Sequence, residues 1–270
     1  MHVVILAAGY GTRLAADLED DDTGDWEHIK NCPKPLLPLG NIPLLTRWAI
    51  MLQELKEVET ICVITNDKFY QLFSSWKTNL GDEELEKKII LYNDFSTSNE
   101  DRLGAVTDLH QASQILPPDN NLLVIAGDTI FRQDFSLRSF LDRLRDLQLQ
   151  EKPASLICHT ECPENAVRKH GIVEIDQKMR VTRFLEKPNP SETTSRFQCP
   201  CFYILSSAAL ELLPIFLDFH QSSPMQEKDA TGKFLKFLVD RMPVFSYQVS
   251  GRFDLGNLKP YTEANKYFSS

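Results

Sequence analysis

The sequence predicts an α/β protein, because short apolar segments alternate with helical patterns along the first half of its 270 residues. Apolar segments that lack a polar face are typical of strands covered by helices on both sides. We expect such strands at residues 3–7, 60–65, 89–92 and 121–126. Helical patterns at residues 44–55, 68–80 and 108–115 lie between them. This order predicts a Rossmann-like arrangement built on a mostly parallel, mixed sheet.

The second half of the chain has a different pattern, with strands that are less regularly separated by helices. We expect strands at residues 155–159, 171–175, 180–186, 201–205 and 244–249. Helices are expected near 208–216, over 231–241 and at 261–270, whereas the composition of 187–195 predicts a loop. This half is interpreted as a mixed-sheet extension, so we expect a single domain over residues 1–270 with two parts, about 1–150 and about 151–270.

Composition and charge exclude several classes of protein. A content of 42% apolar and 25% charged residues is ordinary for a globular protein. The net charge of −9 and the absence of a basic stripe argue against nucleic acid as a partner. No apolar run approaches the length of a membrane span, and the first one is too short for a signal peptide, so we expect a cytoplasmic protein. The six cysteines lack the spacing of a zinc site.

The first expected strand leads into a loop of small residues, Ala7-Ala8-Gly9-Tyr10-Gly11-Thr12, which is followed directly by Arg13. Lys34 lies between two prolines further along the chain. Small residues let a backbone approach a ligand closely, and loop N–H groups near two cations suit a polyanion such as a nucleoside triphosphate.

Two familiar phosphate-binding patterns do not fit this loop. The dinucleotide fingerprint requires a third glycine where Leu14 stands and a helix that continues from it. The acidic run at residues 17–25 is interpreted instead as a solvated loop. The P-loop pattern G-x-x-x-x-G-K-[ST] is also missing from the sequence. A simple glycine-rich turn remains the alternative to phosphate binding.

Two carboxylates follow expected strands. Asp128 comes directly after the strand at 121–126, and Asp254 follows the strand at 244–249 and a short glycine-containing turn. Open α/β sheets bind ligands at the carboxyl ends of their strands, and two carboxylates there suit Mg²⁺ together with substrate phosphates. The alternative for each is an aspartate that closes a turn.

Glu186-Lys187-Pro188 ends another expected strand, and Lys187 in this position would present a point charge to a phosphate. A solvated surface lysine is the alternative. Gly171 begins a strand where a sugar ring could approach the backbone. The histidines have no spacing typical of a metal site or a triad, and G-x-S-x-G does not occur, so nucleophilic catalysis by serine or cysteine is not expected.

In this order the segments resemble the signatures of the sugar-phosphate nucleotidyltransferase family. Residues 6–14 are similar to the nucleotide loop of that family, and residues 33–36 to its second signature. Gly127-Asp128 resembles the metal-binding aspartate after the central strand. Three further segments resemble the sugar-contacting element, the sugar-phosphate signature and the late element with the second metal ligand, namely residues 170–174, 186–188 and 253–257.

The resemblance implies the nucleotide-diphospho-sugar transferase fold and an enzyme that joins a nucleoside triphosphate to a sugar 1-phosphate with Mg²⁺. Arg13, Lys34 and Lys187 would be the catalytic cations, and Asp128 and Asp254 the metal ligands. The nucleotide would be bound by Leu6, Ala7, Ala8, Gly9, Gly11, Thr12, Arg13, Asn93 and Gly104. Gly171, Glu186 and Lys187 would bind the sugar phosphate. On this basis residues 1–150 form the nucleotide-binding half and 151–270 the sugar-phosphate-binding half.

The sequence also departs from the family pattern. Residues 15–32 contain an insert of about ten residues, which we interpret as an exposed loop rather than a lid. The glutamine that reads the base in many relatives is missing, so the sequence leaves the nucleobase open. No second catalytic domain is expected, and the sequence does not decide whether the chain forms a homo-oligomer. A cytidylyltransferase for phosphocholine or another non-sugar phosphomonoester, and a silent nucleotide-sugar-binding protein, are the alternative functions.

Overall fold

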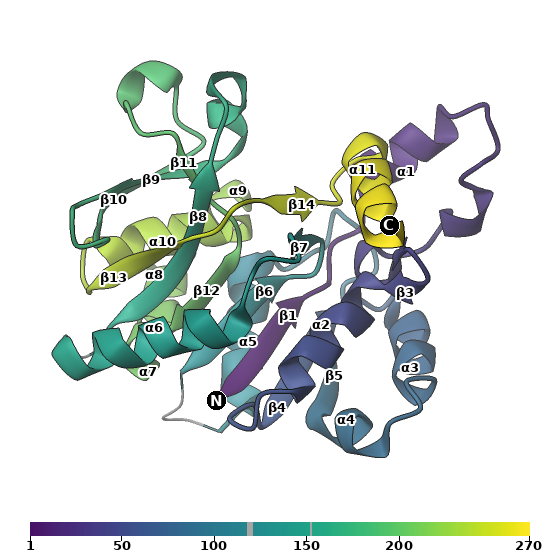
Figure 1. The fold of residues 1–270 in the computed structure, drawn as a ribbon, viewed down its shortest axis with the longest axis horizontal. Coiled ribbons are helices and arrows are strands. Elements are labelled where there is room, and N and C mark those ends of the chain that lie inside the picture. Colours follow the sequence, from purple (N-terminus) through teal and green to yellow (C-terminus); the bar gives the residue numbers. More distant parts are fainter. Residues whose placement is uncertain (118–120, 152) are drawn as a thin grey trace. The chain divides into compact units, whose positions relative to one another are not determined.

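The computed structural model describes residues 1–117, 121–151 and 153–270 of the chain (Figure 1). These residues divide into two compact units, each assembled from segments that are separate in the sequence. The first unit contains Met1–Val4, Leu103–Ile125 and Phe131–Gly251. The second unit contains Ile5–Arg102, Ala126–Ile130 and Arg252–Ser270.

The first unit is built on a mixed sheet with the strand order β10-β9-β11-β8-β12-β6-β1, in which β13 also pairs with β8. The strands are β1 (His2–Leu6), β6 (Leu122–Ala126), β8 (Ser155–Glu161), β9 (Gly171–Ile175), β10 (Val181–Glu186), β11 (Phe197–Cys199), β12 (Phe202–Leu205) and β13 (Val244–Gln248). β1 and β6 begin in this unit and end in the second one. The pairing of β12 with β6 and β8 is antiparallel, whereas β13 runs parallel to β8. The predicted α/β class with a mixed sheet is therefore confirmed.

Helices cover both faces of this sheet because neighbouring side chains of a strand point to opposite sides. Phe202 on β12 packs against Phe140, with ring centroids 5.2 Å apart. The next residue, Tyr203, is hydrogen-bonded through its hydroxyl to Thr231. Phe140 belongs to α6 (Leu137–Gln150) and Thr231 to α10 (Thr231–Val239), so these two helices lie on opposite faces of the sheet (Figure 1). The helices of the unit are α5 (Ala105–Ile115), α6 (Leu137–Gln150), α7 (Ser207–Leu210), α8 (Leu212–Phe219), α9 (Gln226–Asp229) and α10 (Thr231–Val239).

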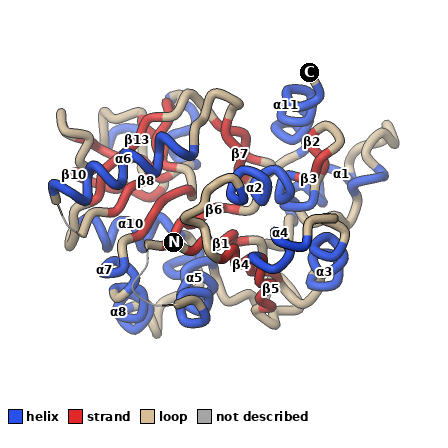
Figure 2. The backbone as a smooth tube through the Cα atoms, turned by 60° about the horizontal axis from the view of Figure 1, so that its bottom comes forward, coloured by secondary structure: helices blue, strands red, loops and turns tan. Residues whose placement is uncertain are grey.

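The second unit pairs β4 (Thr60–Thr65) in parallel with β5 (Ile89–Asn93), next to the end of β1. Helices α3 (Tyr70–Thr78) and α4 (Glu83–Lys88) contact β5, as Figure 2 shows. Trp76 on α3 donates a hydrogen bond to Thr46 on α2 (Leu44–Gln53) at 2.8 Å. The remaining elements are the β2–β3 pair (Pro38–Leu39, Ile42–Pro43), the β7–β14 pair (Thr129–Phe131, Arg252–Asp254), α1 (Thr12–Glu19) and α11 (Leu258–Ser269).

Short 3-10 helices occur at Glu27–Ile29, Lys34–Leu36, Glu164–Lys169 and Pro190–Glu192. The last of these lies within the segment for which the sequence predicts a loop. Within the three described stretches of the chain, no helix combines the length and the apolar character needed to cross a membrane.

The expectation of a loop over residues 17–25 is wrong at its start, because α1 continues to Glu19. Leu14 and Leu18 lie one turn apart and are both buried, which stabilises this helix despite its acidic end. Asp17 has a structural role: its carboxylate accepts hydrogen bonds from the Leu258 N–H at 2.8 Å and from the Asn257 amide at 3.1 Å. These bonds hold the pKa of Asp17 below its ordinary value.

The insert is also attached at a second point. The Trp26 ring meets the ring of Tyr261 edge-on at 5.7 Å, and Ile29 is buried. The acidic residues between α1 and Trp26 are largely exposed. The insert is therefore an exposed acidic turn between two contacts with α11.

Helix α6 is an element that the sequence analysis missed. Its exposed face is strongly polar, but the apolar residues recur at helical spacing and are buried, namely Leu137, Phe140, Leu141, Leu144 and Leu147. Phe140 is central to this contact because its ring packs against Phe202 and, at 5.5 Å, against Tyr247.

We expect Phe140→Ala to lower the free energy of unfolding by about 3–5 kcal/mol, because it removes a fully buried ring from an aromatic cluster. Urea denaturation followed by circular dichroism measures the change. Leu149→Ala on the same helix is the control, since Leu149 is 83% exposed, and it should shift stability by no more than about 0.5 kcal/mol. Equal effects of the two variants would contradict the assignment of α6 to the core.

Candidate active site

The glycine loop begins where β1 ends, between the ends of two other strands. The Ala7 N–H donates to the Ile64 carbonyl at 2.8 Å, and the Gly127 N–H donates to the Leu6 carbonyl at 2.9 Å. The second contact requires glycine, because a Cβ at position 127 would lie 2.8 Å from both the Leu6 oxygen and Pro35 Cγ. The segments after β1, β4 and β6 therefore lie side by side within the second unit.

A cavity of about 100 Å³ lies over these strand ends. It is lined by Leu6, Ala7, Gly9, Gly11, Lys34, Pro35, Gly127 and Asp128. Lys34 Nζ lies 3.2 Å from Asp128 Oδ2, and the lysine side chain is only 13% exposed. Gly11 has a φ of 67°, which suits glycine and places it at the start of α1. The structure thus brings together the glycine loop, the lysine between prolines and the first carboxylate.

The second carboxylate, Asp254, lies in the same unit among cations. Its Oδ2 accepts a hydrogen bond from Arg252 at 2.9 Å, and its Oδ1 accepts one from the Gly256 N–H at 3.0 Å. A Cβ at Gly256 would lie 3.2 Å from a guanidinium nitrogen of Arg13, so Arg13 reaches this turn. Burial alone would raise the pKa of Asp254, but Arg252, with smaller contributions from Lys34 and Arg13, holds it below its ordinary value.

Asp128 and Asp254 are connected through the backbone, because the Leu255 N–H donates to the Asp128 carbonyl at 2.8 Å. Among the residues that the structure describes, no three histidine, cysteine or acidic side chains converge as in a closed metal site. Mg²⁺ does not need such a cluster, since it commonly takes one or two carboxylates and completes its shell with water and substrate phosphates. The donor set of Asp128 and Asp254 therefore fits this cation.

The residues predicted to bind the sugar phosphate lie in the first unit. Gly171 begins β9 and pairs with Glu186 on β10 and Cys199 on β11. A Cβ at Gly171 would lie 2.5 Å from the Phe184 ring, so the position requires glycine. Lys187 follows β10 with a φ of 50°, and its side chain is 59% exposed.

Glu186 is a mostly buried carboxylate, with a side chain that is 12% exposed. Burial raises its pKa, against the opposing effect of Lys187 and Lys233. Its carboxylate also lies against Gly232, where a Cβ would collide with it. Gly232 and Lys233, at the start of α10, are neighbours that the sequence analysis missed, because nothing in the order of motifs connects α10 with residues 186–188.

The two residues predicted to lie near the base belong to different units of the structure. Asn93, in the second unit, donates through its side-chain amide to Asp67 at 2.7 Å and accepts from the Phe95 N–H at 2.9 Å. Gly104, in the first unit, has a φ of 90° and lies against Met225 and Asp229. Their role toward the base stays a prediction.

Arg252 is another residue that sequence reasoning missed. Its side chain is only 9% exposed, and its contact with Asp254 is local. A cation two residues before a predicted metal ligand on a strand lies on the same face as that ligand. This spacing could have identified Arg252 from the sequence as a neighbour of Asp254.

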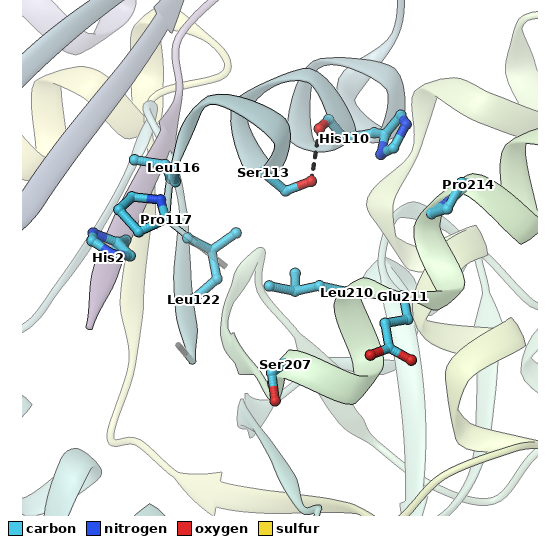
Figure 3. A pocket seen from close by; sticks show the side chains of 10 residues that line it. All are labelled: His2, His110, Ser113, Leu116, Pro117, Leu122, Ser207, Leu210, Glu211 and Pro214. Atoms are coloured by element: carbon cyan, nitrogen blue, oxygen red, sulfur yellow. Dashed lines mark hydrogen bonds between the residues drawn. The ribbon is translucent and has the colours of Figure 1, made fainter. Parts of the chain in front are cut away.

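A second, larger cavity of about 230 Å³ lies within the first unit (Figure 3). It is lined by His2, His110, Ser113, Leu116, Pro117, Leu122, Ser207, Leu210, Glu211 and Pro214. Leu122 and Leu210 project into its centre, and the Ser113 hydroxyl donates to the His110 carbonyl at 2.7 Å. The described lining contains a carboxylate but neither lysine nor arginine, so this cavity does not suit a triphosphate.

Comparison with known proteins agrees with this geometry. A family model described as nucleotidyl transferase matches residues 2–270, so the chain belongs to the nucleotidyl transferase family. The predicted resemblance is therefore confirmed at the level of the family.

A curated relative is the glucose-1-phosphate adenylyltransferase of Bacillus thuringiensis (strain Al Hakam), which is 22% identical over 275 residues. That alignment covers 97% of this chain and 66% of the relative, so the chain spans just under two thirds of its length. A counterpart from Bacillus mycoides (strain KBAB4) is also 22% identical, with the same coverage.

Two solved structures share the fold. A UDP-glucose pyrophosphorylase complexed with UDP-glucose superposes with a TM-score of 0.72 at 19% identity, covering 99% of this chain and 97% of that one. The inositol-1-phosphate CTP transferase of T. maritima gives a TM-score of 0.66 at 14% identity, covering 100% and 96%. These likenesses confirm the predicted nucleotide-diphospho-sugar transferase fold.

We expect Arg252→Gln to raise the pKa of Asp254, because the guanidinium is the main group that opposes the effect of burial on this carboxylate. Asp254 then begins to take up a proton at a higher pH than in the wild-type protein. Carbon-detected NMR titration of the aspartate carboxyl groups measures this shift. Arg145→Gln removes an exposed partner of Asp142 instead, and it should leave the titration of Asp254 unchanged.

Proposed function

We propose that this protein transfers a nucleotidyl group from a nucleoside triphosphate to a sugar 1-phosphate, releasing pyrophosphate and forming a nucleoside diphosphate sugar. The observation that carries the proposal is the convergence of Lys34 and Asp128 on the glycine loop, in one small cavity at the carboxyl ends of β1 and β6. Asp254 and Arg13 add a second carboxylate and a second cation to the same unit. This set of groups is suited to a metal-bound triphosphate.

The proposed reaction is a single displacement at phosphorus. An oxygen of the sugar 1-phosphate attacks the α-phosphorus, a new phosphorus–oxygen bond forms, and the bond to the β-phosphate oxygen breaks as pyrophosphate leaves. No side chain forms a covalent bond in this scheme. The protein contributes by orienting two anions and by neutralising charge that would otherwise keep them apart.

Each cation has a part that follows from its position. Arg13 lies by the Gly256 turn next to Asp254 and would bind the departing phosphates. Lys34 pairs with Asp128 in the cavity and would turn to a phosphate near the α-position, which frees the carboxylate. In the first unit, Lys187 extends into solvent with Glu186 at 3.8 Å and would hold the phosphate of the sugar.

Asp128 and Asp254 would hold Mg²⁺, which supplies charge neutralisation to the phosphates when it is bound. The glycine loop would bind the phosphates through its backbone N–H groups. Ala7 and Ala8 add no bulk between the loop and the ribose, and the backbone of Gly171 would contact the sugar ring. Glucose 1-phosphate is the first acceptor to test, because the curated relatives are named for it.

A pyrophosphate-release assay tests the proposal. The full-length protein is mixed with Mg²⁺, each of the common nucleoside triphosphates and a panel of sugar 1-phosphates, with phosphocholine included as a non-sugar acceptor. We expect release with at least one triphosphate and one sugar 1-phosphate, and none without the acceptor. Tight binding of a nucleotide sugar without turnover of any pair would refute the enzymatic function.

We expect Asp128→Asn and Asp254→Asn each to lower kcat by at least about 100-fold, because each removes a charge from the metal-binding pair. Asp142→Asn is the matched control: its carboxylate pairs with Arg145 on an exposed surface, so activity should be unchanged. Circular dichroism verifies that the variants are folded. Wild-type rates in either site variant would contradict the assignment of the metal ligands.

A further inference from the structure

The glycine loop is fixed to the turn that follows β4. The side-chain amide of Asn66 donates to the Ala8 carbonyl at 2.8 Å, and its oxygen accepts from the Phe69 N–H at 3.0 Å. Asn66 is fully buried, so both ends of its amide are satisfied within the protein. This contact holds the loop at Ala8, one residue before the first glycine.

A second contact holds the same loop between its two glycines. Tyr10 Oη and Ser96 Oγ are 2.9 Å apart, although the two residues are separated by 86 positions in the sequence. Ser96 Oγ also lies 2.8 and 3.0 Å from the two carboxylate oxygens of Asp94. We call this series the Tyr10 chain; it consists of Tyr10, Ser96 and Asp94.

The direction of the hydrogen bonds in the Tyr10 chain follows from proton counting. Burial raises the pKa of Asp94, and the hydrogen bonds from Ser96 oppose this effect. While the Asp94 carboxylate is ionised it only accepts, so the single hydroxyl proton of Ser96 goes to Asp94. Ser96 Oγ must then accept from the Tyr10 hydroxyl. Burial raises the pKa of Tyr10, which keeps this hydroxyl protonated and able to donate.

The far end of the Tyr10 chain is rigid. Asp94 and Ser96 are buried, and the Ser96 N–H also donates to the Asp94 carboxylate at 2.8 Å. The Asp94 N–H donates to the Thr65 carbonyl and the Asp67 N–H to the Ser96 carbonyl, both at 2.9 Å. These bonds attach the segment after β5 to the end of β4. The hydrogen bond from Tyr10 therefore connects the glycine loop to residues 94–96, a segment that is itself held by several hydrogen bonds.

Tyr10 itself is only partly buried. Its ring lies 6.4 Å from the ring of Phe69, and its backbone joins Gly9 to Gly11, both of which line the cavity. Two glycines give a loop many accessible conformations. Ordering the loop when a ligand binds therefore costs conformational entropy, unless contacts within the protein already restrict the loop before binding. Restriction before binding is what increases affinity for a ligand held by backbone N–H groups.

We propose that Tyr10 is a positioning residue for the nucleoside triphosphate, acting through Ser96 and Asp94 to hold the loop between Gly9 and Gly11 in its binding conformation. The inference rests on the proposed function of this loop. It assigns Tyr10 to substrate binding rather than to the chemical step. Loss of the Tyr10 chain should therefore weaken binding of the triphosphate. Binding of the acceptor and the rate at saturation should be unaffected.

The test compares Tyr10→Phe, which keeps the ring and removes the hydroxyl, with Ser96→Ala. We expect each to raise the KM for the triphosphate about 3- to 10-fold, the effect of one hydrogen bond. The kcat and the KM for the sugar 1-phosphate should stay within about 2-fold. The double variant should be no worse than the more affected single variant, because both substitutions break the same series. Thr97→Ala is the control, since Thr97 directly follows Ser96 and its exposed hydroxyl donates to Asp101 at 2.7 Å.

An unchanged KM for the triphosphate in Tyr10→Phe and Ser96→Ala would overturn the proposal, and so would a lower melting temperature without a change in KM. If the wild-type protein shows no turnover, the proposed function fails, and calorimetric titration with each triphosphate and Mg²⁺ decides the role of Tyr10. Binding that is weakened about 3- to 10-fold by Tyr10→Phe supports the positioning role. Equal affinities, or no binding by the wild-type protein, overturn it.

Discussion

The hydrogen bonds on the two sides of Leu6 and Ala7 are the constraint on which the candidate site depends. One bond joins Ala7 to Ile64 at the end of β4, and the other joins Gly127 to Leu6. They place the ends of three strands in register, so that the residues that follow share one small space. The absence of a side chain at Gly127 allows the second bond, because any Cβ would meet the Leu6 carbonyl and Pro35. A packing requirement at one glycine thus determines where Asp128 lies.

The charged groups around this space are arranged in compensated pairs. Lys34 pairs with Asp128, and Arg252 pairs with Asp254. A partly buried charge without a partner is costly, so each cation stabilises the carboxylate that it contacts. Under the proposed function, a triphosphate and a divalent cation would exchange with these internal partners while the balance of charge is maintained. The ion pairs therefore stabilise the charged groups in the absence of a ligand, and this arrangement is compatible with the proposed function.

Much of the fold follows from patterns within single segments, whereas much of the site does not. The buried strand at residues 60–65 is apolar between its two terminal threonines and was predicted at its observed position. Helix α6 was missed because its polar face dominates the composition, and α1 was missed because acidic residues occur at its end and directly after it. The contact of Tyr10 with Ser96 depends on side-chain placement across the fold, which residue order alone does not specify. Arg252 is different, because its local contact with Asp254 was indicated by the spacing of the two residues.

The division of the second unit into three sequence segments has a consequence for how the protein is made. Its last segment supplies α11, whose first N–H donates to Asp17, and β14, which pairs with β7. These pairings close loops of more than a hundred residues, and contacts of such separation form slowly. The glycine loop leaves the ribosome well before Asp254, and this carboxylate joins it only after residues 14–253 have been synthesised. During that interval the apolar side chains of the incomplete unit are exposed, a condition that favours aggregation.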